Sequence, residues 1–392
     1  MAVNRIHPVY AQMKRTIFDH MSGLAREHGA INLGQGFPDD RGPPDVIDAA
    51  ARALAEKSNQ YPPGAGLPEL RDAICGFYAA RQGLDLVREQ VVVTSGATEA
   101  IAASVLALVQ PGDEVILFQP AYDAYAPMVE RAGGVPVSVN LAPPDWRYDA
   151  GRLSEAISPR TRVLMFNDPL NPAGTVASEA DLAAIAEICV RHDLVAICDE
   201  VWEDVRFDGR VHRSLMTVPG MRERSVKIGS AGKIFGLTGW KVGWMCAAGE
   251  MADALGKAHQ FLTYTTPPAL QWAVAEGLAK PAQWFAAQRT GWAMSRDRLK
   301  RGLADAGFTV LPNDATWFLC VDLPASGIGL SDREFSERAV REAGVASIPV
   351  SALFGSEGGP RQIVRFCYTK PDAMLDEAVG RLEEFRRKLC GH

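Results

Sequence analysis

Two side chains of complementary chemistry follow consecutive strands expected in this sequence. Lys233 ends the run S-A-G-K at 230–233, just after the β-prone residues 226–228, and Asp199 follows the apolar run 194–198. A lysine amine can form a Schiff base with an aldehyde, and a carboxylate can hold a pyridine nitrogen protonated. Together the two residues predict a site for an aldehyde cofactor that contains a pyridine ring.

Each of these residues, taken alone, also allows a structural interpretation. An aspartate at the end of a buried strand needs a strong donor, and a helix N-terminus or an arginine would serve Asp199 as well as a pyridinium would. Most loop lysines are solvated. The small residues around Lys233 instead favour a confined amine, whose pKa is lowered by burial and by nearby cations.

A third motif, Gly96-Ala97-Thr98, lies between an expected strand at 91–93 and an expected helix at about 99–108. Backbone N–H groups at a helix N-terminus bind anions, so a phosphate group fits this turn. An ordinary capped turn is the alternative when the motif is considered alone.

The elements that must position these motifs alternate between short apolar runs and helical patterns from about residue 90 to 250, as parallel βαβ units do. Ser178 predicts the N-cap of the clearest helix, and His192 lies near its end. The polar motifs follow the carboxyl ends of the strands, where open parallel sheets bind ligands. The strands that we expect are 91–93, 115–118, 163–166, 195–198, 226–228 and 242–246.

The pattern changes near residue 283, where a long helix reaching about residue 303 is followed by short strands at 316–321 and 363–368. This change predicts a second, smaller α+β domain. The boundaries that we expect are an N-terminal segment at 1–40 that joins the small domain, a large cofactor-binding domain at 41–285 and a small C-terminal domain at 286–392.

Composition excludes several partners. The 392-residue chain has 41 basic and 47 acidic residues, and its formal charge is -6. Nucleic acids and anionic membranes require a basic excess, so neither is an expected partner. The seven cysteines are scattered and never spaced C-x-x-C, which indicates reduced thiols. With no run of membrane-spanning length, these features predict a soluble, cytoplasmic protein.

Several enzyme classes fail on motif details. A Walker A loop is excluded because Lys227 stands where glycine is required and Ile234 where Ser or Thr is required. The runs 34–36 and 64–66 do not complete a dinucleotide fingerprint, no G-x-S-x-G surrounds Ser230, and H-E-x-x-H is absent. We therefore expect no NTPase, nicotinamide, serine hydrolase or metal site.

The run SAGKIFGLTGWKVGW at 230–244 resembles the cofactor-lysine segment of class I/II, fold type I aminotransferases, which use pyridoxal 5'-phosphate (PLP). The run NDPLNPAG at 167–174 is similar to the family motif N-x-P-x-N-P-x-G, and 32–38, 59–61 and 364–366 resemble other family landmarks. The resemblance implies an α/β fold, in which a mostly parallel seven-stranded sheet lies between helices and a smaller α+β domain follows.

The resemblance also implies roles for individual residues. Lys233 would carry PLP as a Schiff base and move a proton at the substrate Cα, while Asp199 would keep the pyridine protonated. Arg365 would bind the substrate α-carboxylate, although the residue alone favours a strand arginine paired with a neighbouring acid. The other implied contacts are Asn171 to the cofactor 3'-oxygen and the substrate, Tyr122 stacked on the ring, Gly96, Ala97, Thr98, Ser230 and Lys241 at the phosphate, Gly36 at the substrate, and Tyr61 reaching the neighbouring site of a homodimer.

Two positions depart from the family pattern. Trp202 replaces the tyrosine usually found three residues after the cofactor aspartate, in D-E-x-Y. An indole N–H can donate to the cofactor 3'-oxygen but can neither ionise nor accept, which puts the usual pH behaviour in doubt. Asp168 adds a carboxylate to the cofactor loop, and no role for it follows from the sequence.

The runs QPAYDAYAPM at 119–128 and GWKVGW at 239–244 are most similar to kynurenine, glutamine and methionine aminotransferases. This similarity implies ping-pong transfer of an amino group from an L-amino acid to a 2-oxo acid. No second substrate arginine is identified, so the expected donors are neutral large or aromatic, such as methionine, glutamine, phenylalanine or kynurenine. A PLP-dependent cysteine-S-conjugate or cystathionine β-lyase is the alternative. The expected pocket walls are Tyr10, Phe18, Phe37, Tyr122, Trp202, Tyr264 and Phe354.

Overall fold

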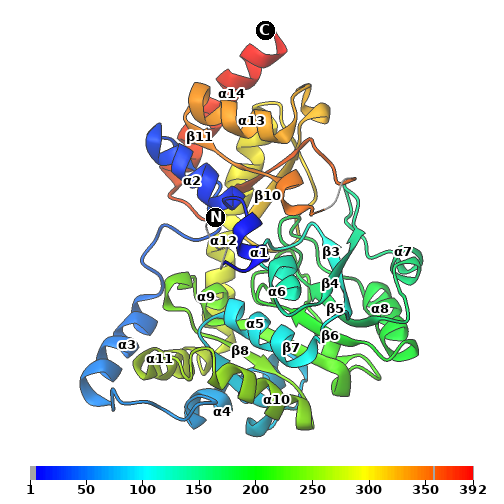
Figure 1. Cartoon of the computed structure of the whole chain (residues 1–392). Coiled ribbons are helices and arrows are strands. Elements are labelled where there is room, and N and C mark those ends of the chain that lie inside the picture. The colour runs from blue at the N-terminus through cyan, green and yellow to red at the C-terminus, as the bar shows by residue number, and fades with distance from the viewer. Residues whose placement is uncertain (1–5, 356–357, 392) are drawn as a thin grey trace.

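A computed structural model describes residues 6–355 and 358–391. Its larger part is built on a seven-stranded sheet with the order β2-β8-β7-β6-β5-β3-β4 (Figure 1). Strand β8 runs antiparallel to both of its neighbours, and all other neighbouring strands are parallel. The strands are β2 (Val91–Thr94), β3 (Glu114–Gln119), β4 (Val135–Asn140), β5 (Thr161–Asn167), β6 (Val195–Asp199), β7 (Ser225–Ser230) and β8 (Gly243–Cys246).

All six strands expected from the sequence in this region are confirmed, with ends that differ by one or two residues. The seventh strand, β4, was not expected. It lies at the edge of the sheet, its residues are mostly exposed or partly buried, and it contains Pro136. An edge strand tolerates proline and lacks the continuous apolar run of a central strand, which explains why the sequence pattern did not reveal it.

Helices cover this sheet, and strands β2, β3, β7 and β8 are consequently buried along their full length. Helix α5 packs on β7 and β8, while α3, α4 and α11 pack together. The helices of this part are α3 (Pro44–Glu56), α4 (Pro68–Gln82), α5 (Ala97–Leu108), α6 (Tyr125–Arg131), α7 (Ala150–Glu155), α8 (Glu179–Arg191), α9 (Ala231–Ile234), α10 (Gly249–Gln260) and α11 (Pro268–Leu278).

Helix α8 begins where the sequence predicts. The Ser178 hydroxyl accepts from the Asp181 N–H at 3.1 Å, and the Asp181 carboxylate accepts from the Ser178 N–H at 2.8 Å. This capping box satisfies two N–H groups at the start of the helix. His192 is its C-cap.

A second, smaller part follows the long helix α12 (Ala282–Asp305), which connects the two parts (Figure 1). Its four-stranded antiparallel sheet has the order β12-β13-β10-β9. The expected strand at 316–321 begins only at residue 318, because Thr316 is in the left-handed region with a φ of 65°. The elements are β9 (Thr309–Val310), β10 (Phe318–Asp322), β12 (Ile348–Pro349), β13 (Ile363–Cys367), α13 (Asp332–Arg338) and α14 (Asp372–Cys390).

The N-terminal region contacts this smaller part. Strand β1 (Ile31–Asn32) pairs in parallel with β11 (Val345–Ala346), and α2 (Ile17–Glu27) packs on β11 and β12. A short helix, α1 (Pro8–Gln12), precedes α2. The domain boundaries given above stay a prediction, and residues 1–5, 356–357 and 392 within them lie outside the described residues. Within the described ranges, no helix has both the length and the apolar character needed to cross a bilayer.

Candidate active site

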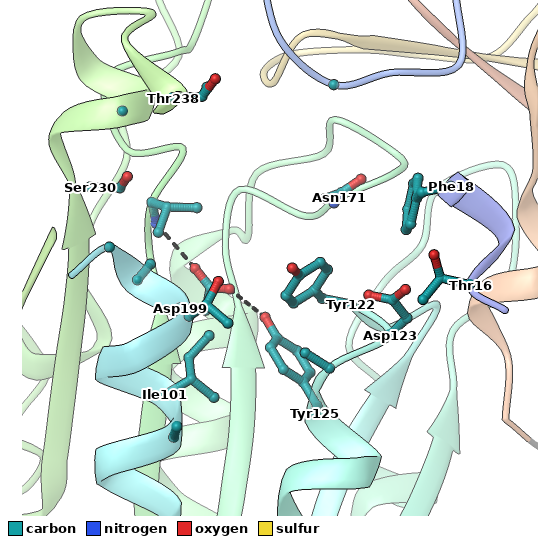
Figure 2. Close-up of a pocket in the computed structure, with 18 of the residues that line it drawn as sticks. Thr16, Phe18, Ile101, Tyr122, Asp123, Tyr125, Asn171, Asp199, Ser230 and Thr238 are labelled. Carbon is teal, nitrogen blue, oxygen red and sulfur yellow. Dashed lines mark hydrogen bonds between the residues drawn. The ribbon is translucent and has the colours of Figure 1, made fainter. Parts of the chain in front are cut away.

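A cavity of about 900 Å³ lies at the carboxyl ends of β5, β6 and β7, between the large sheet, the N-terminal region and the smaller part (Figure 2). Its wall contains residues from across the chain, including Phe18 near the N-terminus and Arg365 on β13. Of the site residues predicted from the sequence, all but one line this cavity. They are Gly36, Gly96, Ala97, Thr98, Tyr122, Asn171, Asp199, Trp202, Ser230, Lys233, Lys241 and Arg365.

Lys233 is on α9, a single turn that begins directly after β7. Its Nζ atom lies 4.7 Å from the centre of the Trp202 ring and 5.3 Å from that of Trp317. Burial lowers the pKa of Lys233 to about 8, although the nearby Asp199 carboxylate acts in the opposite direction. A neutral, nucleophilic amine is therefore accessible near neutral pH.

Asp199 ends β6 and projects toward the same cavity. Tyr125, at the start of α6, donates its hydroxyl hydrogen to the Asp199 carboxylate, as Figure 2 shows. The Val201 N–H donates to the other carboxylate oxygen at 3.4 Å. Burial raises the pKa of Asp199, and these two donors counteract part of that shift. The carboxylate is thus oriented before any ligand binds.

The turn at Gly96 is narrow and bordered by positive charge. Gly96 has a φ of 81°, and a Cβ atom there would lie 3.1 Å from Lys241 Nζ. Ala97 is already the first residue of α5, two residues earlier than expected, so its N–H belongs to the free helix N-terminus. Thr98 also lines the cavity here. The helix N-terminus, the Thr98 hydroxyl and the Lys241 ammonium are groups whose chemistry suits an anion.

Arg365 is 1% exposed and approaches from the opposite side of the cavity. Its Nη1 donates to Asn171 Oδ1 at 3.0 Å and its Nη2 to the Gly34 carbonyl at 2.7 Å. Its Nε–H has no partner among the described residues. The guanidinium therefore binds amide and carbonyl oxygens rather than a neighbouring acid, and burial lowers its pKa to about 10. Gly36 also lines the cavity, where Phe318 fills the space beside it.

Three of the expected residues lie outside the cavity of the single chain. Tyr61 is 83% exposed and packs edge-on against Tyr264 at 5.4 Å, and its expected place at the neighbouring site of a homodimer stays a prediction. Of the expected aromatic walls, Tyr264 and Phe354 also lie elsewhere, whereas the other five do line the cavity.

Sequence reasoning missed other cavity residues. Tyr125 was not identified, although it lies in the motif QPAYDAY three residues after Tyr122, and its N–H donates to the Tyr122 carbonyl at 3.1 Å in the turn that leads into α6. Asp123 and Asp19 add carboxylates to the wall, and the exposed Arg131 adds a guanidinium. Asp123 lies within the motif at 119–128, whereas no sequence motif marks Asp19 or Arg131, because only the fold brings the N-terminal region beside α6.

The geometry agrees with what known proteins show. The model of the family described as aminotransferase class I and II matches residues 28–382. The chain belongs to this family. Probable N-succinyldiaminopimelate aminotransferase DapC of Mycobacterium tuberculosis is 45% identical over 97% of this chain and 98% of its own. Methionine aminotransferase of Escherichia coli is 38% identical over 95% of this chain and 96% of its own.

The fold agrees as well. The structure of N-succinyldiaminopimelate aminotransferase from M. tuberculosis superposes with a TM-score of 0.93 at 44% identity, covering 97% of this chain and 99% of that one. The fold type I architecture predicted from the sequence is confirmed, as is the family. Members of this family use PLP, so this chain is a PLP-dependent aminotransferase.

The cavity of this aminotransferase fits PLP by charge and by shape. The amine of Lys233 and the carboxylate of Asp199 face the same space, and the Gly96 turn lies beside it with Lys241. The unpaired Nε–H of the buried Arg365 indicates that a further acceptor, such as a substrate carboxylate, belongs on that side. Aldehyde, pyridine nitrogen and phosphate each find a complementary group.

Proposed function

We propose that this aminotransferase moves the amino group of a large, neutral or aromatic L-amino acid to a 2-oxo acid by a ping-pong reaction. The observation that carries the proposal is the pair Arg365 and Asn171, held together at 3.0 Å across the cavity from Lys233. A planar guanidinium with a free N–H binds an α-carboxylate in a fixed orientation. That orientation directs the substrate Cα toward the lysine.

PLP, when bound, supplies a carbonyl carbon for the amino group and a ring that accepts electrons from the substrate Cα. The protein must place and move protons. Lys233, with a pKa of about 8, can accept the proton from the substrate Cα and return it to the cofactor side. The rings of Trp202 and Trp317 border the amine and limit its access to water.

Asp199 and Asn171 hold the ring in place in this proposal. The Tyr125 hydroxyl fixes one oxygen of Asp199, which leaves its carboxylate directed at the pyridine nitrogen. Asn171 accepts from Arg365 through Oδ1, so its amide nitrogen is available to donate to the 3'-oxygen. Tyr122 would stack on the ring, and Trp202 would add an N–H donor in place of the usual tyrosine.

The substrate side chain meets a mixed wall. Tyr10, Phe18 and Phe37 provide apolar surface, which favours large side chains. Asp19 and Asp123 line the same cavity, and burial raises the pKa of Asp123. A substrate carboxylate near these acids would be repelled, in agreement with neutral donors.

A second candidate substrate is an N-succinylated diaminopimelate. The 45% identity to the probable N-succinyldiaminopimelate aminotransferase favours it, and the exposed Arg131 on the cavity wall could bind a distant carboxylate. Arg131→Gln is then expected to raise the KM for this substrate about tenfold while leaving that for methionine unchanged. Arg26→Gln, at an exposed arginine outside the cavity, is the matched control.

A substrate screen tests the proposal. Methionine, glutamine, phenylalanine, kynurenine and N-succinyl-diaminopimelate would each be supplied to the holoenzyme with 2-oxoglutarate, and oxo acid formation measured. A neutral donor with the highest kcat/KM supports the first candidate. Each amino acid would also be tested without an oxo acid: stoichiometric product is expected, and catalytic release of pyruvate and ammonia would indicate a lyase instead.

We also propose that the enzyme acts in the cytoplasm as a homodimer, with Tyr61 at the neighbouring site. The high exposure of Tyr61, together with that of Phe261 on a nearby loop, supports this assembly. The large, cofactor-binding part and the small part would then meet at each site with a contribution from the second subunit.

A further inference from the structure

Behind the cofactor cavity lies a buried network of charged side chains that the proposed reaction does not use. It begins in the turn D-E-V-W-E at 199–203, which follows β6. Asp199 and Trp202 line the cavity, whereas Glu200 and Glu203 do not. Both glutamates are buried, with exposures of 0% and 3%. The turn therefore presents Asp199, Val201 and Trp202 to the cavity and two carboxylates to the interior.

Lys227, in the middle of β7, joins these two carboxylates. It is 0% exposed. Its ammonium donates to Glu203 at 2.6 Å and also to Glu200. The carboxylates of Glu200 and Glu203 and the imidazole of His212 have the arrangement of a cation site, with ligand atoms within 4.8 Å of one another. Lys227 supplies the positive charge there.

His212 extends the network to β5. One ring nitrogen lies 3.1 Å from Glu200 and the other lies 3.1 Å from Asp168. Although burial opposes protonation, hydrogen bonds to Asp168 and Glu200 raise the pKa of His212 to about 9. This contact also explains Asp168, for which the sequence offered no role: it is a buried partner of His212 and also accepts from the Ala177 N–H at 2.7 Å.

Further donors hold each carboxylate. Glu200 accepts from the Ser214 hydroxyl at 3.0 Å and from the Leu215 N–H at 3.1 Å. Glu203 accepts from the Tyr78 hydroxyl at 2.8 Å and from Gln82 at 2.6 Å. Both ends of the turn are thus fixed, and Lys227 is the group that connects one end directly to the other.

We propose that Lys227 is a positioning residue: by binding Glu200 and Glu203 together, its ammonium fixes the direction in which Asp199 and Trp202 project into the cavity. The inference rests on the proposed role of Asp199 at the pyridine nitrogen. Glu200 follows Asp199 directly in the chain, and Glu203 follows Trp202 directly. A movement of either glutamate therefore moves the neighbouring cavity residue, because no flexible segment lies between them. Outer partners of this kind typically change activity by 10- to 100-fold.

The test compares two variants with a control. Lys227→Met removes the ammonium that binds Glu200 and Glu203. The double variant Lys227→Met/Glu203→Gln removes the same ammonium together with one buried negative charge. The control, Lys257→Met, alters an exposed lysine that pairs with Asp253. On each holoenzyme, the thermal melting temperature, the pH midpoint of the cofactor absorbance, and kcat and KM for the best donor are measured.

Positioning predicts that kcat falls about 10- to 100-fold, with KM changed much less, and that the absorbance midpoint moves upward. The midpoint moves because a loosened Asp199 holds less positive charge on the ring. The double variant is expected to fold and to show the same spectral shift. A lower melting temperature with an unchanged absorbance midpoint and kcat would contradict the positioning role and show that the network only stabilises the fold. Failure of the double variant to fold would lead to the same conclusion.

The spectral midpoint needs no substrate. It therefore separates this inference from the proposed function: an enzyme inactive toward every donor tested would still show whether Lys227 controls the cofactor environment. Lys257→Met should match the wild type in all measurements.

Discussion

At the scale of single residues, burial acts on the two central groups in opposite directions. It raises the pKa of the Asp199 carboxyl and lowers that of the Lys233 amine, because it disfavours the charged form of each. The Asp199 shift is countered by Tyr125, by the Val201 N–H and by Lys233 itself. The result is an amine that loses its proton near pH 8, close to an oriented carboxyl group.

The lysine pKa leads to a prediction about cofactor capture. Below its pKa of about 8 the amine of Lys233 is mostly protonated and cannot attack an aldehyde. The rate at which apoprotein captures PLP should therefore rise with pH through about 8 and level off above it. Stopped-flow absorbance measures this rate. Lys233→Ala should form no such absorbing species, and a rate that is constant between about pH 7 and about pH 9 would contradict the assignment.

Arg365 provides a second residue-scale prediction. Arg365→Lys keeps a positive charge but loses the fork that reaches Asn171 and Gly34 together. Loss of one charge-assisted hydrogen bond, about 1.5–3 kcal/mol, should lower kcat/KM roughly 10- to 100-fold, mainly through KM. Steady-state kinetics would show this, with the absorbance of bound PLP unchanged. Arg361→Lys, at an exposed position, is the control, and equal losses in both variants would argue against a substrate contact.

At this scale the sequence predicted many of the polar residues on the cavity wall, because most of those residues lie in motifs that follow strand ends. Tyr125 and Asp123 lie within such a motif, yet which side chains face inward depends on the path of the loop into α6. Asp168 could not be understood at all from the sequence, because its partner His212 comes from a segment without a recognisable pattern.

At the scale of elements, strand β8 is the exception in the sheet. It runs antiparallel between β2 and β7, and its first residue, Gly243, passes directly beside the turn at Gly96 and Ala97. A Cβ atom on Gly243 would lie 2.7 Å from the Ala97 nitrogen. A strand inserted this close to a helix N-terminus requires the absence of a side chain.

Gly243→Ala should therefore displace the turn at Gly96 and Ala97 and weaken PLP binding. A displacement of this kind that removes one charge-assisted hydrogen bond would cost about 1.5–3 kcal/mol, a roughly tenfold or greater rise in the Kd for PLP. Equilibrium dialysis or fluorescence titration of the apoprotein measures it. Gly239→Ala in the same motif is the matched control, because a Cβ atom there meets nothing within 4 Å. Similar affinities for both variants would refute the close-approach argument.

The central strands were predictable because buried parallel strands appear in the sequence as uninterrupted apolar runs. Helix α8 was predictable because its N-cap residue directly precedes apolar residues at helical spacing. Strand β4 was not, since an exposed edge strand has no such run. The antiparallel direction of β8 was also not predicted. An apolar run indicates where a strand lies, but the direction of the strand depends on how the chain connects it to its neighbours.

At the scale of the whole molecule, the proposed homodimer assigns Tyr61 to the neighbouring site. Tyr61 is 83% exposed and lies outside the cavity wall. If it serves the neighbouring site, Tyr61→Ala and Lys233→Ala should each be nearly inactive alone, while a coexpressed mixture should regain activity. In a mixed dimer, one site has both an intact lysine and an intact tyrosine.

The regained activity would be measured after separating the mixed dimer by two affinity tags. A quarter to a half of the wild-type rate per dimer, on the order of one active site in two, is expected if the subunits assemble as proposed. A mixed dimer no more active than its parents would mean that Tyr61 acts within its own chain or not at all.

The hydrogen bond between Arg365 and the Gly34 carbonyl joins residues 331 positions apart. Its consequence concerns the order of events on the ribosome. Asp199, Lys233 and the turn at Gly96 leave the ribosome well before Arg365. The proposed binding site for the substrate α-carboxylate can therefore form only after almost the whole chain has been synthesised, because Arg365 must meet Gly34.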